Sequence, residues 1–271
     1  MTNLFYEILT DPFFIKPIIS LFLISLLFSL WGIFVILKRM SFYAESLSHS
    51  TLLSISLAYL LNLNSLFLII LWSIIFSFLI YYFEKNKKIP QDNILAFLFI
   101  FGISFGIIIF SISYINQSKI FSILFGNILL IQKEDMLILS IITILCLLFF
   151  IYNFKKLILL SINQELAYVD GININKSLIF FYILLSLSIV MGLKLIGVVL
   201  VNSLLILPSL SSKLISKSLK EMLFYTIIIS LSTSLIGFIL SIIFNLPIGS
   251  TIALVGSIVF IIFSITKSFL K

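Results

Sequence analysis

Apolar runs of about 20 residues follow one another along most of this chain. An α-helix needs about 20 such residues to cross the ~30 Å hydrocarbon core of a bilayer. The runs match helical spans rather than the alternating segments of ~10 residues that form an outer-membrane barrel. Only 10% of the 271 residues are charged, whereas soluble domains contain about 25%. The sequence therefore predicts an all-α, polytopic helical membrane protein, with residues 1–271 forming a single transmembrane domain.

The runs divide into about nine spans of membrane-crossing length. We expect them near residues 18–37, 42–61, 65–83, 93–114, 136–154, 177–193, 195–210, 222–244 and 250–266. Little more than Lys194 separates the sixth span from the seventh, so one broken helix in place of that pair would reduce the number to eight. Residues 1–16 are expected to form an interfacial segment. Residues 120–131 are apolar but too short to cross, which favours a re-entrant or interfacial segment.

Lysine and arginine are concentrated in alternate segments between the spans. With nine spans and the N-terminus outside, all but four of the 17 Lys and Arg residues lie on the inner side, and the four are Lys16, Lys119, Lys133 and Lys194. Cytoplasmic loops collect these residues, so this orientation is favoured in a bacterial inner (plasma) membrane. The net charge of +7 does not indicate a nucleic-acid partner, because the basic residues are dispersed rather than gathered on one face.

The segment from Ser41 to Ser50 contains the only histidine, His49, and a carboxylate four residues before it, Glu45. Residues at i and i+4 lie on the same face of a helix, which would place an oxygen beside an imidazole nitrogen. An ordinary hydrogen-bonded pair is one interpretation. Ionisable groups within spans are costly, however, and occur mainly on transport pathways or as functional pairs. We therefore interpret Glu45 and His49 as a pair of metal ligands.

Motifs for ATP binding and hydrolysis are missing from the sequence. Gly192 is followed by Gly197 at the spacing of a P-loop, but Val198 stands where the lysine must be. One histidine cannot supply an H-E-x-x-H zinc protease site, and one cysteine, Cys146, cannot form a disulfide within the chain. The chain is expected to be a transport subunit without its own ATP site, not an enzyme, and without a permanently bound cofactor.

The stretch from Asn163 to Ile172 lies in the longest segment predicted outside the membrane, 157–176, on the inner side. It predicts a short helix ended by Gly171, with Ile162, Leu166 and Val169 forming an apolar stripe at i, i+4 and i+7. Such a helix could lie on membrane lipid, or it could dock in the groove of a partner protein.

Gly102 and Gly106 form a G-x-x-x-G pair within the fourth span. Such pairs usually allow two helices to pack closely. Lining of a pore by bare backbone is the alternative interpretation.

Three stretches together resemble the permease subunits of bacterial zinc and manganese ABC importers. Arg39 to Ser50 is similar to that family's R-M-x-x-x-G-[DE]-x-[LI]-[AS]-H-[AS] segment. Glu165 to Ile172 is similar to its E-L-A-x-x-x-G-[IV] coupling loop, and Gly197 to Pro208 is similar to its V-G-x-L-L-V-x-[AS]-L-L-I-x-P run. With the layout of the spans, the resemblance covers nearly the whole chain.

The resemblance implies a vitamin-B12-permease-like architecture, with two copies of the chain forming a pore for Zn²⁺ or Mn²⁺. It also implies a cytoplasmic ATP-binding subunit and an extracytoplasmic metal-binding protein as partners. The residues implied for contact with the ATPase are Glu165, Leu166, Ala167, Val169, Asp170 and Gly171.

His49 matches the family's pore histidine, and Glu45 stands where the family usually has aspartate. Ala44 replaces a common glycine, and Tyr168 replaces a residue that is usually small or basic. An ion-coupled secondary metal transporter is the alternative function. It would normally contain an inverted repeat and several buried carboxylates, whereas Glu45 is the one acidic residue clearly within a predicted span.

Overall fold

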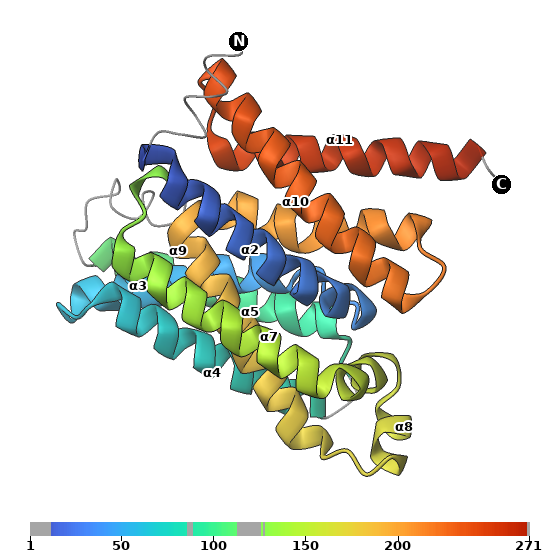
Figure 1. Ribbon diagram of the computed structural model, residues 1–271. Helices are drawn as coiled ribbons and strands as arrows, with labels where there is room; N and C mark the ends of the chain where they lie inside the picture. The colour runs from blue at the N-terminus through green and yellow to red at the C-terminus, as the bar shows by residue number, and fades with distance from the viewer. Residues whose placement is uncertain (1–11, 86–88, 113–125, 127, 270–271) are drawn as a thin grey trace. The chain divides into compact units, whose positions relative to one another are not determined.

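The computed structural model describes residues 12–85, 89–112, 126 and 128–269, and its described elements are all helical (Figure 1). The all-α prediction is therefore confirmed. In chain order the elements are α2 (Pro12–Leu37), α3 (Tyr43–Leu60), α4 (Ser65–Lys85), α5 (Gln91–Ile112), the 3₁₀ helix η1 (Ile128–Leu130), α7 (Lys133–Ile162), α8 (Gln164–Val169), α9 (Ile174–Ile215), α10 (Leu219–Phe244) and α11 (Ile248–Phe269).

Seven of the described helices are long and apolar enough to cross a membrane, namely α2, α4, α5, α7, α9, α10 and α11. The helix α3 has 18 residues, but its serines and the Glu45–His49 pair lower its hydropathy. Among the described helices, α3 corresponds in position to the predicted second span, and α9 covers the predicted sixth and seventh.

The helix α9 is broken, and its break lies at Gly197 rather than at Lys194. The backbone there has φ 80° and ψ 170°, a conformation that only glycine adopts readily. The break also makes a backbone contact, because a Cβ added to Gly126 would lie 2.4 Å from the Gly197 nitrogen. Nearby, the Lys194 ammonium pairs with Asp135 at the start of α7. The break at Gly197 thus lies against the backbone of Gly126, where a side chain on Gly126 would not fit.

Several predicted boundaries were wrong because helices continue beyond the apolar runs. The first helix begins at Pro12, so residues 12–16 are helical and not a separate interfacial segment; residues 1–11 lie outside the described residues. The helix α7 continues through its lysines to Ile162, which shortens the predicted loop from 157 to 176. Residues 128–130 of the predicted re-entrant segment form η1, and 120–125 and 127 lie outside the described residues.

The helices form two compact units. The first comprises Met1–Ile33, Gly126–Leu147 and Lys194–Lys271, and the second comprises Phe34–Phe125 and Leu148–Leu193. In the first unit, α10 is joined to α2 by buried serines: the hydroxyls of Ser25 and Ser234 lie 2.7 Å apart, and Ser230 Oγ donates to the Ser25 carbonyl at 3.0 Å. Small hydroxyl side chains allow such close helix contacts in a membrane protein.

In the second unit, α5 packs directly on α3. A Cβ added to Gly102 would lie 2.3 Å from the Cβ of Ser50, and one added to Gly106 would lie 2.7 Å from the backbone nitrogen of Leu53. These distances are too short for any side chain. The packing interpretation of the G-x-x-x-G pair is therefore confirmed, and the pair holds α3 in place.

Candidate functional site

The predicted pair of Glu45 and His49 forms on one face of α3. The Nε2 atom of His49 lies 2.8 Å from Glu45 Oε1. Both side chains are about one-third exposed, at 32% for His49 and 36% for Glu45, so other groups can reach them. The ring of Phe99 on α5 meets the imidazole edge to face, with ring centroids 5.4 Å apart. An oxygen and a nitrogen donor thus lie side by side, supported by an aromatic ring.

Hydrogen bonds to neighbouring helices fix the part of α3 that carries this pair. Ser46 Oγ donates to the Leu95 carbonyl of α5 at 2.6 Å. Trp72 Nε1 of α4 donates to Ser50 Oγ at 3.0 Å. Because Ser46 and Ser50 are buried next to Glu45 and His49 in the chain, these bonds hold the rotation of the helix. The donor pair is therefore presented by a rigid segment.

The described residues of this chain place two neighbouring candidate donors at α3, Glu45 and His49, and not a full set of metal ligands. Among them, no group of three or more His, Cys, Asp and Glu side chains could hold a metal ion. Zinc usually takes four ligands, so water or a second chain would have to complete its shell.

The predicted short helix on the inner side is α8, the yellow helix between α7 and α9 in Figure 1. The Asn163 side chain caps its start by accepting from the amides of Glu165 and Leu166, at 2.8 and 3.3 Å. At its end the amide of Gly171 donates to the Tyr168 carbonyl, and the amide of Ile172 donates to the Ala167 carbonyl. Gly171 has φ +72°, so these bonds form a Schellman motif. The prediction of a helix ended by Gly171 is confirmed.

The apolar stripe of α8 differs from the predicted one. Ile162 is the last residue of α7, and the cap residue Asn163 separates it from α8. Ala167 is fully buried, whereas Leu166, Tyr168 and Val169 are exposed at 55%, 74% and 81%. The short helix therefore faces the protein with a small residue and faces outward with three large apolar ones.

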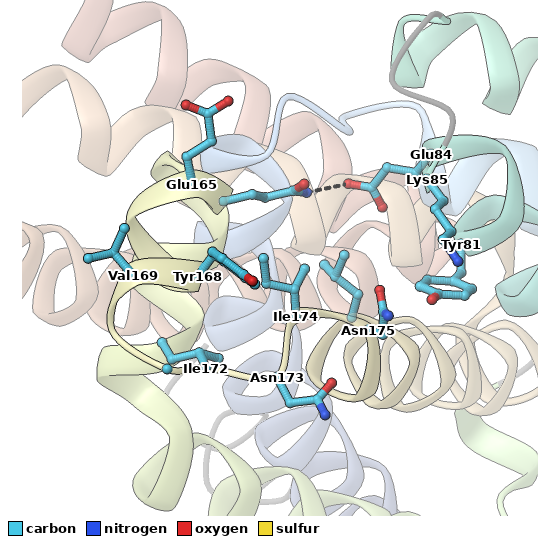
Figure 2. Close-up of a pocket in the computed structure, with 13 residues that line it drawn as sticks. Tyr81, Glu84, Lys85, Glu165, Tyr168, Val169, Ile172, Asn173, Ile174 and Asn175 are labelled. Atoms are coloured by element: carbon cyan, nitrogen blue, oxygen red, sulfur yellow. Dashed lines mark hydrogen bonds between the residues drawn. The ribbon is translucent and has the colours of Figure 1, made fainter.

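A cavity of about 1060 Å³ lies beside α8 (Figure 2). Figure 2 shows Tyr168 and Val169 on one side of it and Tyr81 and Glu84 on the other. The residues that line it come from the end of α4, from α8 and from the start of α9: Tyr81, Glu84, Lys85, Gln164, Glu165, Tyr168, Val169, Gly171, Ile172, Asn173, Ile174, Asn175 and Leu178. The side of α8 that carries Tyr168 and Val169 is thus accessible from this cavity. The helix contacts α4 through the hydrogen bond from Gln164 to Glu84.

Nothing in the sequence indicated that Glu84, which lines this cavity, is buried. Glu84 is only 8% exposed and accepts from four side chains. Its Oε1 accepts from Lys38 at 3.2 Å, from Gln91 at 2.6 Å and from Gln164 at 3.0 Å, and its Oε2 accepts from the Tyr182 hydroxyl. We call these five residues the Glu84 cluster. Lys38 and Glu84 lie just beyond the ends of the predicted spans 18–37 and 65–83, and no spacing relates two residues so far apart in the chain.

The ammonium of Lys38, just beyond the end of α2, is also enclosed by aromatic rings. Its Nζ lies 5.7 Å from the ring centre of Phe181 and 5.4 Å from that of Tyr182. Burial lowers the pKa of Lys38, and the neighbouring Glu84 carboxylate opposes that shift. The cluster therefore holds an ion pair in a nearly closed environment, where each charge has several partners.

Comparison with known proteins gives consistent matches over almost the whole chain. The model of the ABC 3 transport family matches residues 10–267. The chain is 35% identical over 237 residues to the high-affinity zinc uptake system membrane protein ZnuB of Buchnera aphidicola subsp. Baizongia pistaciae, covering 87% of this chain and 91% of that protein. It is 31% identical over 263 residues to the manganese import system permease protein ScaB of Streptococcus gordonii, covering 97% and 94%.

A solved structure, PsaBC from Streptococcus pneumoniae in complex with Fab, shares the fold. Its matching chain has a TM-score of 0.81 and 27% identity, with 97% of this chain and 94% of that chain covered. The shared helical fold and the family match over almost the whole chain agree, and this chain belongs to the ABC 3 transport family.

Proposed function

We propose that this chain is the permease subunit of an ABC importer that moves a divalent metal ion into the cytoplasm, zinc first and manganese second. The observation that carries the proposal is the Glu45–His49 pair, with its donor atoms 2.8 Å apart on a helix fixed by packing. Relatives named for zinc uptake and for manganese import support the choice of cargo. As a family member with several apolar helices, the chain is a multi-pass protein of the bacterial inner membrane.

Zinc is placed first because of the donor atoms. Imidazole nitrogen suits zinc, whereas manganese prefers oxygen ligands. Glu45 supplies an oxygen donor that both ions accept. The imidazole nitrogen of His49 favours zinc over manganese.

A second copy of the chain would complete the ion's surroundings. A twofold axis near α3 would bring together two copies of Glu45 and two of His49, which equals the four ligands that zinc usually takes. Water can take the place of any ligand that does not reach the ion. A partly open shell of this kind suits an ion that must leave again, and it motivates the proposed homodimer.

Energy would come from a separate cytoplasmic ATPase subunit that contacts α8, since the chain has no P-loop of its own. An extracytoplasmic metal-binding protein would deliver the ion on the other side, and lipid would surround the outer faces of the spans. The contact on α8 is proposed for Glu165, Leu166, Ala167, Val169, Asp170 and Gly171. Of these, the exposed Leu166 and Val169 offer apolar area for a groove.

The test is metal uptake into proteoliposomes that contain this chain, its co-purified ATPase subunit and the metal-binding protein. Uptake of zinc or manganese should require ATP on the cytoplasmic side and should persist when ion gradients are collapsed. Uptake that needs an ion gradient and no ATPase subunit would instead support the secondary transporter.

Replacing Leu166 by Asp tests the contact at α8. The charge would have to enter an apolar groove without a partner, so we expect loss of ATPase co-purification and of ATP-driven uptake while the membrane part stays folded. Leu63→Asp is the matched control, because Leu63 is similarly exposed, at 51% against 55%, in the turn between α3 and α4 on the predicted outer side. If both variants retain the ATPase equally well, α8 is not the contact.

A further inference from the structure

The Glu84 cluster joins five elements of the second unit at one carboxylate. Glu84 itself belongs to α4, and Gln91 begins α5. Lys38 follows α2, Gln164 begins α8, and Tyr182 lies in the first stretch of α9. Each of these four side chains donates a hydrogen bond to Glu84.

The charges in this cluster resist displacement. The side chains of Lys38 and Glu84 are only 3% and 8% exposed, so both charges depend on protein partners more than on solvent. Breaking one contact of a buried ion pair leaves charge that is poorly compensated, which is costly. The Glu84 carboxylate is therefore the common partner through which the five segments are joined.

The attachment of α8 to this carboxylate is specific. Gln164 is the first residue of α8, and its Nε2 donates to Glu84 Oε1 at 3.0 Å beside the cavity (Figure 2). Such a bond to a charged acceptor is stronger than one between neutral groups. The bond uses only the Gln164 side chain, so the exposed Leu166, Tyr168 and Val169 remain accessible to a partner.

The same carboxylate is connected to the helix that bears Glu45 and His49. Tyr182, which donates to Glu84, stacks its ring on that of Tyr43 with centroids 6.1 Å apart and planes at 10°. Tyr43 is the first residue of α3, and its hydroxyl lies 2.7 Å from Ser186 Oγ in α9. These contacts lead from α8 through Glu84 and Tyr182 to the start of α3.

We propose that Glu84 is the positioning residue of α8, holding it through Gln164 and joining its movement to α3 through Tyr182 and Tyr43. The proposal rests on the proposed function for the role of α8 as the ATPase contact. Displacement of α8 by the ATPase would then shift the Glu84 carboxylate and, with it, the aromatic pair at the start of α3.

The test compares Gln164→Leu with Gln91→Leu. Both remove an amide that donates to the same oxygen of Glu84, but Gln164 lies in α8 and Gln91 in α5. Hydrogen exchange is followed in the purified full chain at the amides of Ala167, Asp170, Gly171 and Ile172, which are bonded within or just after α8. We expect exchange at these amides to rise about tenfold in Gln164→Leu and to stay unchanged in Gln91→Leu.

Uptake per ATP hydrolysed is measured in the reconstituted complex as the second readout. It should fall in Gln164→Leu and remain near the wild-type value in Gln91→Leu. Equal exchange at the α8 amides in the two variants would overturn the proposal, because the cluster would then stabilise the fold without positioning α8. Faster exchange in Gln164→Leu alone, with uptake per ATP unchanged, would support the positioning role and contradict the ATPase contact at α8.

Discussion

Two carboxylates of the second unit, Glu45 and Glu84, have opposite surroundings. Glu45 pairs with His49 on its own helix and remains 36% exposed. Glu84 is 8% exposed and accepts from side chains of four other segments. An open pair can exchange its ligands with an arriving ion, whereas a closed cluster holds its partners in place. Both residues are glutamates, so the side chain itself does not distinguish them. What distinguishes a candidate ion site from a structural contact is how exposed the carboxylate is and how many hydrogen-bond partners already surround it.

The largest effect is expected at the open pair. Replacing His49 by Ala should abolish zinc and manganese uptake, because only the Glu45 carboxylate would then remain of the two neighbouring donors. Dimer assembly and basal ATPase activity should remain, since the side chain is partly exposed and its loss leaves the packing at Gly102 intact. Uptake assays with size measurements of the detergent-solubilised complex check this. Wild-type uptake by the variant would reduce Glu45 and His49 to an ordinary hydrogen-bonded pair.

Substitutions in the Glu84 cluster should change the stability of the fold. Lys38→Ala removes the cation from a buried pair and should lower the free energy of unfolding by about 3–5 kcal/mol. Combining Lys38→Met with Glu84→Gln removes both charges and should recover part of that loss. Lys194→Ala is the control, because its pair with Asp135 is more exposed and should contribute only ~0–1 kcal/mol.

Unfolding of the purified variants in detergent measures these differences. A similar loss in Lys38→Ala and Lys194→Ala would mean that burial does not distinguish the two ion pairs, and the contrast with Glu45 would weaken.

The smallest effect concerns the choice of acid at the open pair. Glu45→Asp keeps a carboxylate on a stem that is shorter by one methylene, and should retain most uptake. Glu45→Gln keeps the length but loses the charge, and should retain less. The apparent affinity for zinc in transport assays is the measurement. Better uptake by Gln than by Asp would show that stem length outweighs charge at this site.

The candidate site was predictable where it depends on neighbours in the chain. The spacing of Glu45 and His49 requires only that α3 be a helix, and the serine-rich helix forms there. The short helix α8 was likewise visible, because Asn163 can cap its start and Gly171 can adopt a positive φ at its end. The Glu84 cluster was not predictable, since its members come from five segments and each taken singly is typical of a loop or a helix end.

The sequence by itself determined that the chain is helical and approximately where its long helices lie, because about 20 apolar residues must form a helix in lipid to satisfy their backbone hydrogen bonds. It also determined which side chains share a helix face. Tertiary structure decided the rest: α7 continues to Ile162, α9 breaks at Gly197, and Glu84 is buried against Lys38. The physical reason is that helix formation and same-face pairing depend on residues a few positions apart, whereas burial of a charge depends on which distant segments surround it.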